Sequence, residues 1–377
     1  MTGLAAPLPA AEVERALAPL GEARMLPTAA YTEPEVLAWE REHLFAKRWV
    51  CGGRSVPSEP GAQCARPLGA GSVLLVRDDE ATLRAFANVC RHRGHELLAL
   101  DESATRQQIR CPYHGWTYGL DGALRHATGG DVVDGASCTL GAWPVVEWLG
   151  WAFVNARGDA GPFDTQVAGL TEILKPYNPA SLVAVEQREY VVAANWKVLH
   201  ENYQECLHCP RIHPELCRVS PPDSGANVAP GASWVGGWMD LRDDAETMSM
   251  TGARVGPVHP GLDESAQRRV GYFALLPNLL VSAHPDYVLT HRFEPLSPGT
   301  TRVECEWLVA PGVTDISDAL ELWDLTNRQD WAACESVQRG LESGAHLPGP
   351  IVEREDAVHH FVRLIATAYL GKATRKT

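Results

Sequence analysis

The motifs Cys90-Arg91-His92 and Cys111-Pro112-Tyr113-His114 decide the fold of the first half of the chain. Each motif offers one sulfur and one ring nitrogen as metal ligands. Two thiolates and two imidazoles suit a [2Fe–2S] cluster in which histidines replace cysteines on one iron. Zinc ribbons also use paired ligands, but more often as C-x-x-C knuckles. The pattern therefore favours an iron–sulfur cluster over zinc.

Short apolar or alternating runs surround both motifs, at residues 72–77, 83–89 and 151–154, with glycine and proline between them. This pattern predicts an all-β segment built from hairpins. Gly94 and Gly115 follow the two histidines, where a tight loop needs conformational freedom. We therefore expect a cluster-binding domain over residues 46–157, preceded by a tail and a helix over residues 1–45.

A second set of ligands lies at Glu205-Cys206-Leu207-His208 and His213. Two imidazoles that lack only a carboxylate suit a mononuclear iron with open positions for oxygen. We expect a helix over residues 195–209 that carries Glu205 and His208 on one face. Pro210 would end this helix, so that the following turn brings His213 to the same metal. Taken alone, the pattern also fits two surface histidines near a helix end.

The third ligand of the mononuclear site is expected on a long helix predicted over residues 315–341. Asp324, Asp330 and Glu335 are the carboxylates considered. The helix face of Asp330 is otherwise apolar and holds Trp323, Cys334, Val337 and Leu341. An aspartate on an apolar face is costly unless it is paired or bound to metal. Asp330 is therefore the predicted ligand.

Length and composition fit an enzyme of two domains. The 377 residues carry a formal net charge of −14, which argues against a nucleic-acid partner. No apolar run is long enough to cross a membrane, and we expect a cytoplasmic protein without structural disulfides. Residues 158–377 are predicted to form an antiparallel sheet packed with helices. The sequence indicates two late helices and four successive strands, at residues 270–276, 279–284, 288–293 and 301–309. The predicted class is α+β, with a helix-grip type of second domain.

Both cluster motifs, extended to Gly94 and to Gly115-Trp116, resemble the Rieske motif of the Rieske non-haem iron oxygenases. The resemblance implies the alpha, or oxygenase, subunit of such an enzyme. The ligands would be Cys90, His92, Cys111 and His114 for the [2Fe–2S] cluster, and His208, His213 and Asp330 for a mononuclear Fe(II).

Glu205 points to a narrower branch of this family. Most members carry aspartate at this position, where it links the two metal centres across a subunit boundary. Glutamate in the setting Glu201-Asn202-Tyr203-Gln204-Glu205-Cys206-Leu207-His208-Cys209 resembles the choline, carnitine and glycine-betaine monooxygenases and the proline-betaine demethylases. The resemblance implies a head-to-tail homotrimer in which Glu205 is catalytic and electrons pass from His114 through Glu205 to His208.

This branch implies O2-dependent hydroxylation of a quaternary ammonium substrate at an N-methyl group, followed by loss of formaldehyde. Aromatic faces recognise such cations, and the candidates are Tyr203, Trp234, Trp238 and Tyr287. A betaine also needs a partner for its carboxylate, and the sequence does not single one out. The chain has no G-x-G-x-x-G fingerprint, so electrons from NAD(P)H must come from a separate flavin and iron–sulfur reductase.

Three other functions stay open at this point. Two are oxygenases, acting on an aromatic acid or on a bulkier natural product. The third is a Rieske electron carrier, which would leave the residues around His208 and Asp330 without a function. The roles of Cys206 and Cys209 also stay open, because a Cys-His-Cys group on one turn is poor geometry for zinc.

Overall fold

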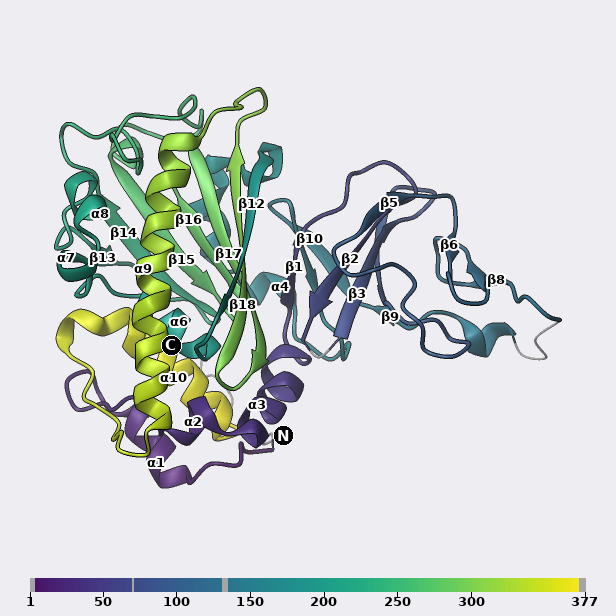
Figure 1. Ribbon diagram of the computed structural model, residues 1–377, viewed down its shortest axis with the longest axis horizontal. Coiled ribbons are helices and arrows are strands. Elements are labelled where there is room, and N and C mark those ends of the chain that lie inside the picture. The colour runs from purple at the N-terminus through teal and green to yellow at the C-terminus, as the bar shows by residue number, and fades with distance from the viewer. Residues whose placement is uncertain (1–3, 70, 131–134, 373–377) are drawn as a thin grey trace. The chain divides into compact units, whose positions relative to one another are not determined.

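The computed structural model describes residues 4–69, 71–130 and 135–372, and the chain forms two compact units (Figure 1). One unit comprises Arg41–Phe163. The other joins Met1–Glu40 to Asp164–Thr377. The expected boundaries were residues 1–45, 46–157 and 158–377, so the structure groups the N-terminal segment with the second domain rather than leaving it apart.

The unit Arg41–Phe163 is built from three small antiparallel sheets, apart from the short helices η2 (Arg41–Phe45) and η3 (Gly135–Cys138). Its strands are β1 (Val50–Arg54), β2 (Ala62–Leu68), β3 (Gly71–Arg77), β4 (Leu83–Ala87), β5 (Ser103–Thr105), β6 (Ile109–Arg110), β7 (Thr117–Tyr118), β8 (Leu124–His126), β9 (Ala142–Trp143), β10 (Val145–Trp148) and β11 (Trp151–Val154). The sheet orders are β1-β11-β10, β5-β2-β3-β4-β9 and β6-β7-β8. The predicted all-β domain is confirmed.

One hydrophobic core joins the five-stranded sheet of this unit to its metal-binding loops. Leu74 and Phe86 from the sheet belong to the same buried cluster as Cys90, Cys111 and Tyr118. The two cysteines are each 2% exposed. The loops are therefore held at their sulfur ends by ordinary apolar packing.

A seven-stranded antiparallel sheet forms the centre of the second unit, in the order β12-β18-β17-β16-β15-β14-β13. Its strands are β12 (Val183–Val192), β13 (Ala226–Asn227), β14 (Trp234–Asp240), β15 (Arg269–Leu275), β16 (Leu279–Ala283), β17 (Tyr287–Ser297) and β18 (Thr300–Val309). The four strands predicted after residue 270 are all present. The predicted α+β class, with a sheet packed against helices, is confirmed.

Helices border this sheet, and the long helix α9 (Ser317–Glu342) runs across its face in Figure 1. The others are α1 (Ala10–Glu14), η1 (Arg15–Leu17), α2 (Ala29–Thr32), α3 (Pro34–Glu40), α4 (Phe163–Gln166), α5 (Leu170–Leu174), η4 (Lys175–Tyr177), η5 (Pro179–Ser181), α6 (Trp196–Tyr203), α7 (Cys209–Ile212), α8 (Pro214–Val219), η6 (Ala266–Arg268), η7 (Glu353–Glu355) and α10 (Asp356–Tyr369). Among the described residues, no helix is both long and apolar enough to cross a membrane.

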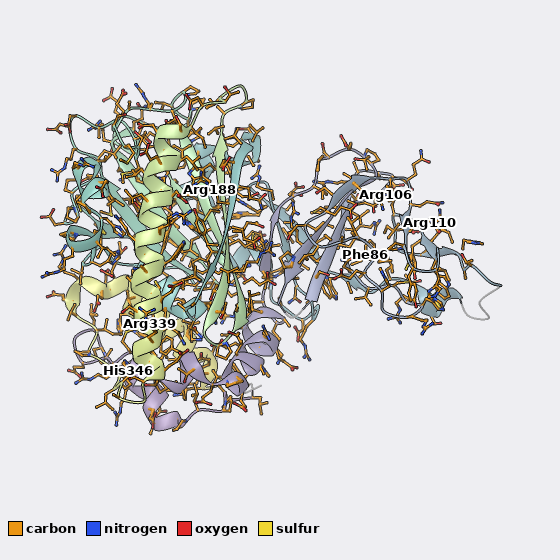
Figure 2. The ribbon with its side chains drawn as sticks, in the orientation of Figure 1. Phe86, Arg106, Arg110, Arg188, Arg339 and His346 are labelled. Atoms are coloured by element: carbon orange, nitrogen blue, oxygen red, sulfur yellow. A yellow bond between two sulfur atoms is a disulfide. The ribbon has the colours of Figure 1, made fainter. Side chains whose placement is uncertain are left out.

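Polar contacts fasten α9 to the edge strand β12. Arg188, labelled in Figure 2, places Nη1 2.9 Å from Oδ1 of Asp324. Glu335 accepts a hydrogen bond from the backbone N–H of Ala193 at 3.1 Å. Two of the three carboxylates considered for the metal are therefore engaged in holding the helix, which leaves Asp330.

A buried ion pair ties the N-terminal segment to the second unit. Glu40 of α3 and Lys197 of α6 are both fully buried, with Nζ 2.6 Å from Oε1. Glu40 also accepts hydrogen bonds from the indole of Trp196 and the hydroxyl of Tyr369 on α10. Satisfying every polar atom of a buried pair offsets its desolvation, and here that requires three separate helices to meet.

Candidate metal centres and substrate cavity

Two loops of the same construction present Cys90 with His92 and Cys111 with His114. In each loop the cysteine carbonyl accepts a hydrogen bond from the glycine four residues on, Gly94 at 3.0 Å and Gly115 at 3.1 Å. Both glycines have positive φ, +75° and +72°, a conformation that other residues adopt only with strain. The sequence thus forms two matching turns, each with a sulfur and an imidazole at its tip.

In these loops the cysteine sulfurs lie together, and the histidine rings lie together. The two sulfurs are buried, and burial raises the pKa of the Cys111 thiol, with a further contribution from the neighbouring Cys90. The rings of His92 and His114 lie together, with centroids 4.7 Å apart, and Nδ1 of His114 is buried without a hydrogen-bond partner among the described residues. Paired sulfurs beside paired imidazoles fit a [2Fe–2S] cluster with thiolates on one iron and histidines on the other.

Two aromatic residues support this site. The hydroxyl of Tyr118 lies 3.2 Å from Sγ of Cys90 and also accepts the backbone N–H of Arg91 at 3.1 Å, so its proton is free to point at the sulfur. The Trp116 ring stacks on His92, with centroids 4.7 Å apart and planes 7° apart. Hydrogen bonds to the sulfurs of such clusters set their reduction potential.

The segment that carries Glu205 and His208 is not helical. Helix α6 runs from Trp196 to Tyr203, and its N-cap Asn195 accepts the backbone N–H of Lys197 with its side chain. The prediction of a helix over residues 195–209 is therefore wrong, and Pro210 lies in the first turn of α7 rather than ending α6. Proline suits that position because the N–H it lacks would have had no partner there.

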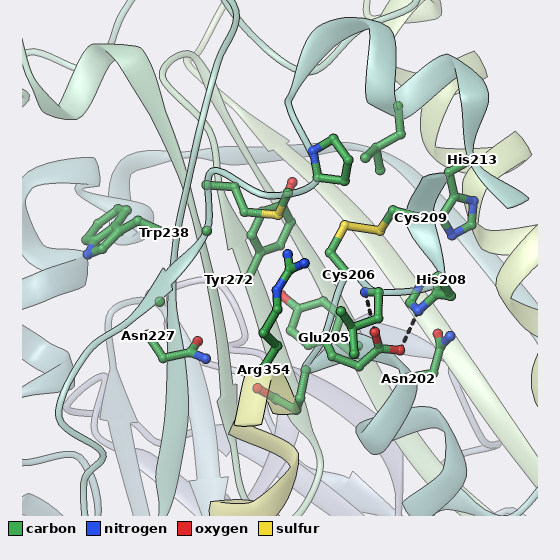
Figure 3. Close-up of a pocket in the computed structure, with 18 of the residues that line it drawn as sticks. Asn202, Glu205, Cys206, His208, Cys209, His213, Asn227, Trp238, Tyr272 and Arg354 are labelled. Carbon is green, nitrogen blue, oxygen red and sulfur yellow. Dashed lines mark hydrogen bonds and ion pairs between the residues drawn. A yellow bond between two sulfur atoms is a disulfide. The ribbon is translucent and has the colours of Figure 1, made fainter. Parts of the chain in front are cut away.

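Glu205 nevertheless reaches His208, because the irregular segment folds back on itself. One carboxylate oxygen lies 2.5 Å from Nδ1 of His208, and the other accepts the backbone N–H of Leu207 (Figure 3). Both oxygens of Glu205 are thus used within four residues of chain.

His208, His213 and Asp330 converge on one point. Nε2 of His213 lies 2.9 Å from Oδ1 of Asp330, and Nε2 of His208 lies 3.4 Å from the same oxygen. The opposite nitrogen of His213 contacts the amide oxygen of Gln329 at 2.7 Å. Each imidazole is therefore held at Nδ1 and presents Nε2 to the carboxylate, which is the orientation that metal-binding histidines need.

The charges of this group also favour a cation. Burial opposes protonation of His208, but hydrogen bonds to Asp330 and Glu205 outweigh it and raise its pKa to about 9. Burial likewise opposes ionisation of Asp330, and the two histidines more than compensate, so its pKa is lowered. One carboxylate between two imidazoles suits a mononuclear Fe(II) with open positions.

The apolar face predicted for Asp330 is only partly correct. Trp323, Cys334 and Leu341 are buried, as expected, but Val337 is 51% exposed. Gln338, which is 2% exposed, takes the buried position between Cys334 and Leu341 instead.

Cys206 and Cys209 form a disulfide on either side of His208. The expectation that the chain has no disulfides is therefore wrong for this pair. Sγ of Cys209 lies within 4.8 Å of ligand nitrogens of His208 and His213. As a disulfide sulfur it has no thiolate to offer a metal, so it does not join the predicted ligand set of two histidines and one aspartate.

A cavity of about 380 Å³ adjoins the three converging side chains (Figure 3). Four aromatic residues line it, and they are Tyr203 of α6, Trp238 of β14, Tyr272 of β15 and Trp323 of α9. The rings of Tyr203 and Tyr272 meet edge to face with centroids 6.0 Å apart, and those of Tyr272 and Trp323 lie 6.3 Å apart. The hydroxyl of Tyr203 lies 3.0 Å from that of Ser282, which fixes its ring.

Of the four aromatic residues predicted for the substrate, only Tyr203 places its ring with this group. Gly237 pairs with Tyr272 across β14 and β15, so alternation puts Trp234 and Trp238 on the opposite face. Figure 3 shows the Trp238 indole turned away from Tyr272, and the Arg269 guanidinium covers its ring at 4.1 Å.

Trp234 and Tyr287 lie outside the cavity lining. The indole of Trp234 donates to the carbonyl of Ala168 at 2.9 Å. Tyr287 is fully buried, and its hydroxyl donates to the carbonyl of Met248 and accepts the indole N–H of Trp323. Tyr287 therefore supports the cavity by holding Trp323.

Sequence reasoning missed Tyr272, Gln329, Arg354 and the place of Trp323 in the cavity lining. Two of them carried a usable signal: Trp323 lies two turns before Asp330 on the same helix face, and Gln329 directly precedes Asp330. Tyr272 and Arg354 reach the cavity through strand register and through a distant turn, for which the sequence offers no local pattern.

Two known protein families match the chain, one in each of its two compact units. Residues 47–134 match the Rieske [2Fe-2S] domain, and residues 179–371 match the catalytic domain of the ring hydroxylating alpha subunit. The glycine betaine monooxygenase oxygenase subunit of Chromohalobacter salexigens is 30% identical over 365 residues, covering 86% of this chain and 81% of that protein. The carnitine monooxygenase oxygenase subunit of Escherichia coli K12 is 29% identical, covering 92% of this chain and 94% of that protein.

The same relationship is found among solved structures. A quaternary ammonium Rieske monooxygenase in complex with L-carnitine superposes with a TM-score of 0.78 at 25% identity, covering 96% of this chain and 99% of that one. The chain therefore belongs to the Rieske non-haem iron oxygenases and is an oxygenase, or alpha, subunit. Within that family it is a monooxygenase of the quaternary ammonium branch, related to the glycine betaine, carnitine and choline enzymes. The family and branch predicted from the motifs are confirmed, and an oxygenase subunit of this kind works with a separate reductase.

Proposed function

We propose that this enzyme hydroxylates an N-methyl group of a small betaine-type quaternary ammonium compound and thereby demethylates it. The observation that carries the proposal is the group of three aromatic rings, Tyr203, Tyr272 and Trp323, in the same cavity as His208, His213 and Asp330. Aromatic faces attract a cation that has lost its water, by about 0.5–2 kcal/mol for each contact.

The charged residues around the cavity support a cationic substrate. Four acidic residues line it, and they are Glu205, Asp330, Glu353 and Asp356. One arginine and no lysine stand against them. A methylated nitrogen would thus be attracted both by the rings and by the surrounding carboxylates.

The proposed ligands are those predicted from the sequence. Cys90, His92, Cys111 and His114 would hold the [2Fe–2S] cluster, and His208, His213 and Asp330 the mononuclear iron. When bound, these centres supply electron transfer and oxygen chemistry. The residues of the chain set the geometry: Gln329 and Glu205 orient the two imidazoles, and the aromatic rings hold a methyl group beside them.

In the overall reaction, one atom of O2 enters the C–H bond and the other leaves as water, with a pair of electrons from NAD(P)H through the reductase. The carbinolamine then loses formaldehyde and a proton, which leaves a tertiary amine. We further propose that Glu205 is the link between centres, reaching His114 of a neighbouring protomer in a homotrimer. Its contact with His208 supports this role.

Three alternatives are less well supported by the cavity. An aromatic acid carries no cation for the aromatic rings and the four acidic side chains to attract. A Rieske electron carrier would not need the group of Asp330 with His208 and His213. A bulkier natural product would have to fit within about 380 Å³.

The test is single turnover of the reduced, iron-loaded protein with O2 and one compound at a time: glycine betaine, L-carnitine, choline and benzoate. We expect formaldehyde from the quaternary ammonium compounds and no hydroxylated benzoate. Trp323→Leu should weaken binding of the active compound by about 2- to 30-fold, the range expected for loss of one cation–π contact, while Trp323→Phe keeps most of the affinity. Hydroxylated benzoate without formaldehyde from any ammonium compound would refute the proposal.

A further inference from the structure

Arg354 is the exception in an otherwise acidic cavity. Among the described residues that line the cavity, it is the single arginine, and no lysine accompanies it. Figure 3 shows its side chain pointing into the cavity, toward Tyr272 and Cys206. A cavity for a simple cation gains nothing from such a residue, because like charges repel.

Most of the acidic residues in the lining already have partners, but Arg354 has none. Glu205 contacts His208, and Asp330 contacts both histidines. Asp356 accepts a hydrogen bond from the amide of Asn227 at 2.7 Å. Across the part of the chain that the structure describes, the guanidinium of Arg354 makes no hydrogen bond and no ion pair, not even with the adjacent Glu353.

The backbone beneath Arg354 is nevertheless held in place. The N–H of Ile351 donates to the carbonyl of Ala23 at 3.1 Å. The N–H of Val352 donates to the carboxylate of Glu355 at 2.8 Å, and the Asn227–Asp356 hydrogen bond ties the following turn to β13. Arg354 is exposed at this turn. Its guanidinium is therefore available to an anion, and binding would have to order the side chain but not the backbone.

We propose that Arg354 binds the carboxylate of a zwitterionic substrate whose methylated nitrogen lies among Tyr203, Tyr272 and Trp323. This inference rests on the proposed function and narrows it: the enzyme would select betaines over cations that lack a carboxylate. A guanidinium suits this task because its fork of N–H groups matches the two oxygens of a carboxylate. The aromatic rings around the nitrogen would set the position of the methyl group, and Arg354 would bind the carboxylate at the opposite end of the substrate.

The experiment compares glycine betaine with choline, which carries a hydroxymethyl group where betaine carries a carboxylate. Dissociation constants from equilibrium dialysis and single-turnover formaldehyde are measured for the wild type, Arg354→Gln, Arg354→Lys and Arg363→Gln. Arg363 is exposed on α10 and does not line the cavity, so it controls for loss of a surface charge.

We expect Arg354→Gln to weaken betaine binding by about 10- to 100-fold, the effect of losing a charge-assisted contact. Choline binding should stay within about twofold or improve, because a repelling charge has gone. Arg354→Lys should recover part of the betaine affinity, and Arg363→Gln should resemble the wild type.

Equal effects of Arg354→Gln on betaine and choline, or no effect on either, would overturn the assignment. So would a wild type that binds both compounds equally. In each of these cases formaldehyde release from the wild type shows that the proposed function still stands. If the wild type releases formaldehyde from neither compound and instead hydroxylates benzoate, both proposals fail.

Discussion

Gln329 offers a direct test of how the iron site is held. Its amide oxygen accepts the Nδ1 hydrogen of His213 at 2.7 Å, and His213 is 1% exposed. Gln329→Leu would leave that N–H buried without an acceptor and the ring free to turn. Loss of such supporting contacts typically lowers metal affinity by about 10- to 100-fold, or about 1.4–2.8 kcal/mol.

The assay is competition of the iron-loaded protein against a graded series of Fe(II) chelators, with iron counted after each exchange. The visible absorbance of the [2Fe–2S] cluster serves as an internal control, because its ligands lie in the other compact unit and should not respond. Gln329→Glu retains an acceptor and should stay close to the wild type. If Gln329→Leu holds iron as tightly as the wild type does, the hydrogen bond does not contribute to the site.

Three further variants test separate features. Glu205→Gln retains an oxygen for His208, so it should keep both centres loaded yet nearly abolish oxidation of the reduced cluster by O2 with substrate; full-speed oxidation would contradict the proposed link. Lys197→Met should cost about 3–5 kcal/mol by leaving Glu40 charged and buried, seen as a large fall in melting temperature, whereas exposed Lys175→Met should change stability by less than about 0.5 kcal/mol. Burial raises the pKa of Glu201 to about 8, so its contribution to stability is present at low pH and lost as pH rises through 8. Glu201→Gln should reduce this loss of stability in melting curves recorded between pH 5 and 9. An unchanged pH profile would assign the loss to other groups.

The proposed metal ligands could be picked out from the sequence because most of them lie in short local motifs. Cys90 with His92, and Cys111 with His114, lie within one turn apiece, and the turn geometry follows from the chain itself. Asp330 was found by a different route, from the cost of burying an aspartate on an apolar helix face. Both arguments use short-range sequence patterns that do not depend on the rest of the fold.

The substrate cavity was not predictable in the same way. Trp234 and Trp238 were chosen because they lie near one another in sequence, but the pairing of Gly237 with Tyr272 sends their rings to the other face of the sheet. A shift of one residue in that register would exchange the two faces. Arg354 depends on a turn fixed by residues more than three hundred positions away, such as Ala23.

The segment between α6 and α7 is irregular where the sequence predicts a helix over residues 195–209. This irregular backbone builds the proposed iron site. On a continuous helix, Glu205 and His208 would be side by side, but the backbone N–H of Leu207 would be used within the helix and could not restrain the carboxylate. Because the helix ends at Tyr203, that N–H is free to bind one oxygen of Glu205 while the other holds His208. The Cys206–Cys209 disulfide closes the same segment. The segment therefore has three local restraints in place of regular helical hydrogen bonds. Together these restraints orient Nε2 of His208 toward Asp330.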